Sequence, residues 1–147
     1  MQSFLKHYNM SAYQVYYLKA NLSEKRFRHI IGVAETARAL AQKWGADADK
    51  AFLAGLVHDC AKEIPVNKAV ERLTASGYSP DEVELRSPAL LHAPLGAVVA
   101  REVFGISDKE VLNAVTFHTT GRTEMSLLEK IIYVADFTLP IMSKKDD

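Results

Sequence analysis

The sequence predicts an all-α fold, a helical bundle with short loops. Apolar residues recur at helical spacing along most of the chain, and residues typical of helix caps and stops separate the apolar segments. No long alternating run of β-branched residues, which would indicate strands, competes with this pattern. A chain of 147 residues can bury a core. We therefore expect a single domain over 1–147, with its core at about 22–136 and a polar, disordered tail at 143–147.

Cap and stop residues place the helices in order. Ser11 caps a short helix rich in tyrosine, and Ser23 opens a longer one that places Trp44 on its apolar face and ends at Gly45. Asp47 or Asp49 opens the third helix. Later helices are expected from Pro65 to Gly77, from the turn at 79–82 with Pro80 at its first position, over 87–104, and after capping boxes at 107–110 and 126–129.

Four histidines and two aspartates stand in these helices as candidate metal ligands. In chain order they are His29, His58, Asp59, His92, His118 and Asp136, and we expect them at helix ends, apart from His29. Imidazole and carboxylate bind iron, manganese and zinc, and six such groups exceed the needs of one tetrahedral site. Two metal ions about 3.5–4 Å apart are an established arrangement for phosphate-ester hydrolysis. A lone histidine is more often structural, as we expect for His7 at the surface, but the six together favour a metal centre.

Composition narrows the function classes. Lys plus Arg and Asp plus Glu are 18 each, so the formal net charge is zero, which argues against broad nucleic-acid binding. The single cysteine, Cys60, excludes an intrachain disulfide, suits a reducing cytoplasm and is interpreted as a buried small residue and not as a nucleophile. We find no signal peptide and no apolar run of about 20 residues, and expect a cytoplasmic protein without a membrane span.

The order of these ligands resembles the HD-domain phosphohydrolases, and more narrowly the YqeK-type enzymes that cleave diadenosine tetraphosphate symmetrically to two ADP. The segments that carry the resemblance are 23–29, 32–37, 58–63, 91–97, 118–122 and 126–136. The resemblance implies that His29, His58, Asp59 and Asp136 hold one metal ion, and that Asp59 bridges to a second ion completed by His92 and His118. It also implies a di-iron centre, with manganese as an alternative.

Other polar residues near this pattern are candidates for substrate contact. Lys62 follows His58 in the HD-x-x-K pattern of the family, and Arg26 is one helical turn before His29; either could hold a phosphate or lie on a solvated face. Thr119, Thr120 and Arg122 could form a pocket wall, although a plain helix end is nearly as well supported from physics alone. Glu63 could orient Lys62 or lie at the surface.

The expected activity is attack of a metal-bound hydroxide on phosphorus, with Asp59 and Lys62 as catalytic residues and ADP as the leaving group. Two alternatives stay open: hydrolysis of another nucleotide, such as a dNTP or a (p)ppGpp-like alarmone, or a non-catalytic module that senses nucleotide or metal. A nucleotide is the expected partner, without nucleic-acid polymer or membrane. Tyr13, Tyr16 and Tyr17 could form a homodimer interface or belong to the core.

The resemblance changes after Asp136. The related sequences continue with a Glu-Pro-x-Arg-like segment, whereas this chain has Leu139 in place of the glutamate and Met142 in place of the arginine. In the family that arginine is expected to help hold the nucleotide.

Overall fold

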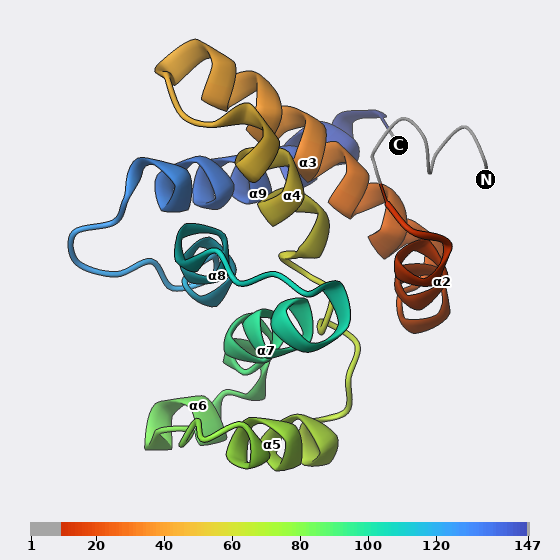
Figure 1. Cartoon of the computed structure of the whole chain (residues 1–147), viewed down its shortest axis with the longest axis vertical. Helices are drawn as coiled ribbons and strands as arrows, with labels where there is room; N and C mark the ends of the chain where they lie inside the picture. Colours follow the sequence, from red (N-terminus) through yellow and green to blue (C-terminus); the bar gives the residue numbers. More distant parts are fainter. Residues whose placement is uncertain (1–9, 147) are drawn as a thin grey trace.

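The structure is a computed structural model that describes residues 10–146, with side chains described as far as residue 139. Its described part is helical and contains no β-strand, which confirms the all-α prediction (Figure 1). The elements are α2 (Ala12–Asn21), α3 (Glu24–Trp44), α4 (Ala48–Val57), α5 (Val66–Ala75), α6 (Glu82–Arg86), the 3₁₀ helix η1 (Pro88–Leu90), α7 (His92–Phe104), α8 (Lys109–Thr116) and α9 (Leu127–Asp146). His7 and the side chain of Met142 lie outside the described residues.

Helix α3 is the central element, because α4 and α9 both pack against it and α8 joins α4, α7 and α9 (Figure 1). Small residues permit this close packing. A Cβ atom added to Gly55 of α4 would lie 2.6 Å from the Cα atom of Ala34 in α3, so only glycine fits there. Ala34, Ala37 and Ala41 of α3 are fully buried. The close approach of α3 and α4 brings their polar residues near one another.

Three predicted helix starts are confirmed by the capping contacts. The Ser11 and Ser23 side chains each accept a hydrogen bond from the backbone N–H three residues later. The Asp47 side chain accepts from the backbone N–H groups of Asp49 and Lys50 at the start of α4. Helix α3 ends at Gly45, whose φ of 83° is the left-handed conformation that glycine adopts at little cost.

Two other predicted starts are wrong. The helix predicted to start with Pro80 as its first residue instead starts at Glu82 as α6. Asp81 caps it, because its side chain accepts a hydrogen bond from the backbone N–H of Glu84. Asp108 caps α8 in the place predicted for Ser107. In both cases a carboxylate lies next to the predicted cap, and its negative charge is better stabilised at a helix N-terminus than a neutral hydroxyl.

The helix predicted over 87–104 is divided into η1 and α7 at Leu91. Pro94 explains the division, because a proline ring clashes with the carbonyl four residues earlier and provides no N–H. Proline fits best in the first turn of a helix, and Pro94 is the third residue of α7. The division makes His92 the first residue of α7, in agreement with its predicted place near the start of a helix.

The last helix is longer than predicted. Asp136 was expected at its end, but the backbone stays helical to Asp146, which includes most of the segment predicted as a disordered tail. Ser143 to Asp146 contain no glycine or proline, and lysine is favoured near a helix C-terminus, so the chain has no local reason to leave the helix. No helix in the described residues is long and apolar enough to cross a membrane.

One aromatic residue lies elsewhere than predicted, and the structure separates the tyrosines for which two places were open. Trp44, predicted on the apolar face of α3, is 62 % exposed, because it is the last residue of the helix. Tyr13 and Tyr16 are exposed, whereas Tyr17 packs edge-on against Phe104.

Candidate metal centre

The structure brings together all six predicted ligand residues. His58 caps the end of α4 and Asp59 follows it, His92 begins α7, and His118 lies just after α8. His29 and Asp136 instead project from the interiors of α3 and α9, because the two helices pack side by side. Asp136 was expected at a helix end, and that placement is wrong.

The potential ligand atoms form two overlapping groups. The first contains His29, His58, Asp59 and Asp136, and the second contains Asp59, His92 and His118; within each group the ligand atoms lie within 4.8 Å of one another. Asp59 belongs to both groups because its two oxygens face opposite ways. Its Oδ2 atom lies 3.4 Å from His58 Nε2, and its Oδ1 atom lies 3.3 Å from the Nε2 atoms of both His92 and His118.

Backbone carbonyls orient three of the histidine rings. The Nδ1–H groups of His58, His92 and His118 donate to the carbonyls of Gly55, Ala89 and Val115, at 2.6, 2.7 and 2.7 Å. Each carbonyl is three residues before its histidine, at or near the end of a helical segment where carbonyls lack helical partners. These bonds leave Nε2 free to face the cluster, as outer hydrogen bonds do for histidines that bind metals.

The Nε2 atoms inside the cluster need a cation. His92 Nε2 and His118 Nε2 lie 3.1 Å apart, and two lone pairs at that distance repel unless a proton or a metal ion lies between them. His58 Nε2 is buried and has no hydrogen-bond partner among the described residues, although two carboxylate oxygens lie within 3.4 Å. The donor set of four imidazoles and two carboxylates therefore fits a divalent metal site.

The pKa shifts of the clustered residues also indicate that the site favours a positive charge. Burial would lower the pKa of His58, but the carboxylates of Asp59 and Asp136 raise it to about 10. Burial would raise the pKa of Asp59, but the positive charge of His58 and hydrogen bonds from the histidines hold it well below its usual range. Burial lowers the pKa of His118, which favours the neutral imidazole that binds metals. The site thus stabilises a positive charge between anionic oxygens.

Two predicted phosphate-binding residues lie beside the cluster. Arg26 donates from Nη1 to Asp59 Oδ2 at 3.0 Å, so it is part of the cluster and not of a fully solvated face. Its side chain is 32 % exposed and can also reach an incoming anion. The Lys62 side chain is exposed one turn after Asp59, and its ammonium has no hydrogen-bond or ion-pair partner among the described residues. Glu63 does not orient it, because its carboxylate accepts from the Ser23 backbone N–H at 2.7 Å.

The segment after His118 makes contacts of its own within the protein. Arg122 donates twice to the buried carboxylate of Glu129, at 2.9 and 2.7 Å, and its guanidinium lies over the Phe117 ring. Its planar fork is therefore bound within the protein. Thr119 and Thr120 line a hollow that includes none of the six ligand residues. The structure does not bring these three predicted contact residues to the centre.

Two further residues near the candidate centre differ in how well the sequence predicts them. The buried ion pair of Glu129 was not predicted, whereas Cys60 was correctly interpreted as a buried residue. Glu129 was read only as part of a capping box, although it is 2 % exposed and, through Arg122, connects α9 to the turn that carries His118. The available signal was its position between Leu128 and Ile132, which places it on the apolar side of the helix. Cys60 is buried, its Sγ donates to the Gly96 carbonyl, and burial raises the pKa of its thiol, so it is not an activated nucleophile.

Comparison with known proteins identifies relatives of this arrangement. Residues 26–139 match the HD domain family. A protein of Halalkalibacterium halodurans named bis(5'-nucleosyl)-tetraphosphatase, symmetrical, is 48 % identical over 84 % of this chain and 65 % of its own length. The Bacillus subtilis protein of the same name is 41 % identical over 84 % of this chain and 66 % of its own length.

A solved structure shows the same fold. It is described as a predicted HD superfamily hydrolase involved in NAD metabolism from Clostridium acetobutylicum, and it is 50 % identical with a TM-score of 0.83. The match covers 87 % of this chain and 69 % of that one. The chain spans about two thirds of the length of the curated relatives it matches.

Proposed function

The chain belongs to the HD-domain family, and on that premise we propose that it hydrolyses diadenosine tetraphosphate symmetrically to two ADP. The observation that carries the proposal is the position of Asp59, whose two oxygens face two separate groups of histidines. A carboxylate so placed suits the bridge between two metal ions. The names of the two curated relatives support this substrate, and we propose iron, with manganese as an alternative, because the donor set mixes imidazole with carboxylate.

In this proposal one ion would be held by His29, His58, Asp59 and Asp136, and a second by Asp59, His92 and His118. When bound, such ions activate a water molecule and neutralise phosphate oxygens. The protein's part is to keep these ligands in place before substrate arrives, since the backbone carbonyls already fix three of the imidazole rings.

The two cations beside the cluster would position the polyphosphate. Arg26 is held by Asp59 through one nitrogen and keeps further N–H donors for a phosphate oxygen. The free ammonium of Lys62 would stabilise the charge on the departing ADP. Water adds its oxygen to one of the two central phosphorus atoms and loses a proton to the solvent, the central P–O–P bridge breaks, and the bridging oxygen leaves with the other half, so that each half is an ADP. We also propose that the enzyme works in the reducing cytoplasm, in agreement with its single, unpaired cysteine.

Product analysis tests the substrate and the cleavage position together. Protein reconstituted with Fe²⁺ without oxygen, or with Mn²⁺, is expected to convert diadenosine tetraphosphate to ADP alone, as resolved by anion-exchange chromatography. ATP plus AMP would mean that a different bridge is cleaved. If protein shown to hold metal yields no product from this substrate, from dNTPs or from (p)ppGpp, the chain is a nucleotide- or metal-binding module instead of an enzyme.

A further inference from the structure

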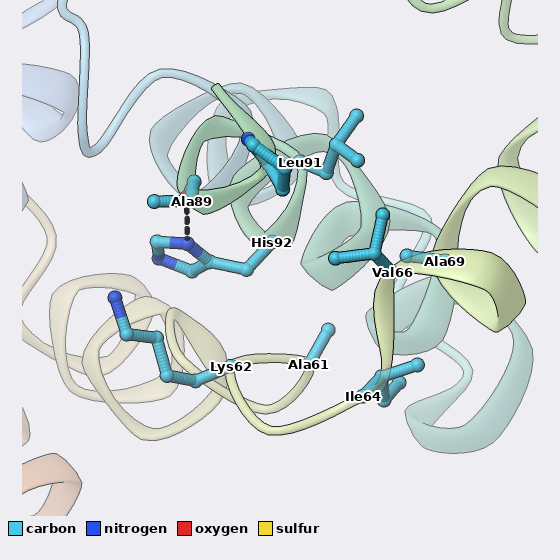
Figure 2. A pocket seen from close by; sticks show the side chains of 9 residues that line it. Ala61, Lys62, Ile64, Val66, Ala69, Ala89, Leu91 and His92 are labelled. Carbon is cyan, nitrogen blue, oxygen red and sulfur yellow. Dashed lines mark hydrogen bonds between the residues drawn. The ribbon is translucent and has the colours of Figure 1, made fainter. Parts of the chain in front are cut away.

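A pocket of about 240 Å³ adjoins the candidate metal centre and has a different chemical character from it. It lies between the turn after Asp59, the first turn of α5 and the segment around η1 (Figure 2). Its walls include the apolar residues Ile64, Val66, Ala69, Pro88 and Leu91. Figure 2 shows Lys62 and His92 together at one end of the pocket and the aliphatic side chains toward the other.

The polar end of the pocket connects it to the cluster. His92 lines the pocket, and its Nε2 atom is 3.3 Å from Asp59 Oδ1. Lys62 stands opposite His92 and has no ion-pair partner among the described residues, so its ammonium is available to an anion at this boundary. A molecule with phosphates at the cluster and an uncharged part attached to them would pass Lys62 and reach the aliphatic walls.

We infer that this pocket binds one nucleobase of the nucleotide, with Lys62 on the phosphates attached to the same nucleoside. The polyphosphate itself does not fit aliphatic walls, because its charged oxygens would lose their hydration without a partner. A base presents flat apolar faces that such walls can cover. Sites for drug-sized ligands enclose about 300–1,000 Å³, so the pocket suits one base and not the whole dinucleotide. The inference rests on the proposed function, which supplies the nucleotide.

The side chains that line the pocket indicate that it does not distinguish one purine base from another. Apart from Lys62 and His92, none of the side chains that line it carries a hydrogen-bonding group, and the Ala89 carbonyl is already bound by His92 Nδ1–H. Discrimination between ligands of similar shape needs polar partners that one of them leaves unpaired. Adenine and guanine are therefore expected to bind with similar affinity.

Titration calorimetry on Mn²⁺-loaded protein tests the inference with three ligands: ADP, GDP and inorganic pyrophosphate, which lacks a base. Val66→Trp narrows the pocket at its rim, where Val66 is 48 % exposed and the larger side chain does not disturb the core. We expect this variant to weaken ADP and GDP binding about tenfold or more, equivalent to 1.4 kcal/mol, and to leave pyrophosphate within twofold. Asn67→Trp, an exposed neighbour on α5 outside the pocket, is the matched control and should change none of the three.

The outcomes separate this inference from the proposed function. Suppose that the wild-type protein binds all three ligands. The nucleobase inference is then wrong if Val66→Trp does not weaken ADP binding, or if it weakens pyrophosphate binding as much as ADP binding. The proposed function stands in either case. If ADP and GDP differ in affinity by more than about tenfold, the expectation that the pocket binds adenine and guanine alike is wrong. If metal-loaded wild type binds neither ADP nor pyrophosphate, the proposed function fails and the inference fails with it.

Discussion

Replacing Asp59 with alanine is expected to reduce hydrolysis by at least about 10³-fold, because one carboxylate serves both groups of ligands. Its removal takes an anionic donor from each group and leaves His92 and His118 without the oxygen that lies 3.3 Å from both. It also leaves Arg26 without its ion-pair partner, and this uncompensated positive charge repels a metal cation. Bound metal should therefore decrease together with turnover.

Metal content after dialysis, measured by elemental analysis beside ADP release, checks this prediction. Circular dichroism establishes that the helices are retained. Asp49→Ala is the matched control, since it removes an exposed carboxylate from the first turn of α4 and should leave both readings at the wild-type level. An Asp59→Ala protein that keeps its metal and its turnover would contradict the shared role of this carboxylate.

Replacing Gly55 with alanine is expected to lower the free energy of unfolding by about 1–2 kcal/mol. Overpacking costs about 1–3 kcal/mol, and the added Cβ would lie 2.6 Å from backbone atoms of Ala34, which cannot rotate away. The higher helix propensity of alanine offsets up to about 1 kcal/mol of this. Because the Gly55 carbonyl accepts from His58 Nδ1–H, displacement of α4 also moves a predicted ligand, and Mn²⁺ affinity should fall by about tenfold.

Urea unfolding of the metal-free protein and Mn²⁺ titration measure the two effects separately. Gly32→Ala provides the control on the neighbouring helix, because its Cβ would meet only the end of the flexible Leu139 side chain. We expect that variant to stay within about 1 kcal/mol of wild type, with unchanged metal affinity. Equal stability and metal affinity in Gly55→Ala would show that the α3–α4 contact does not position His58.

The sequence predicts the composition of the candidate centre better than its boundaries. The residue types, their order and their places on amphipathic helices were sufficient to select six residues that the structure brings together, although their role as ligands stays a prediction. Helical spacing alone placed Arg26 near His29, and the structure adds its ion pair with Asp59. Local capping chemistry similarly placed the starts of α2, α3 and α4.

Three features of the structure could not be predicted because they depend on tertiary contacts or on where a helix ends. The fork of Arg122 on Glu129 joins residues seven apart across a non-helical turn, so no helical period relates them. The position of Asp136 inside α9 depends on where that helix ends, and no glycine marks the end. The aliphatic pocket beside Lys62 is assembled from α5, η1 and the preceding turn, and such a tertiary arrangement leaves no local pattern.

The number of metal ions bound by the wild-type chain tests the central claim most directly. Equilibrium dialysis against Mn²⁺, followed by elemental analysis of metal and protein, should give about two ions per chain, one for each group that shares Asp59. One ion or none at saturation would contradict the bridging role of Asp59, and with it the two-metal basis of the proposed hydrolysis.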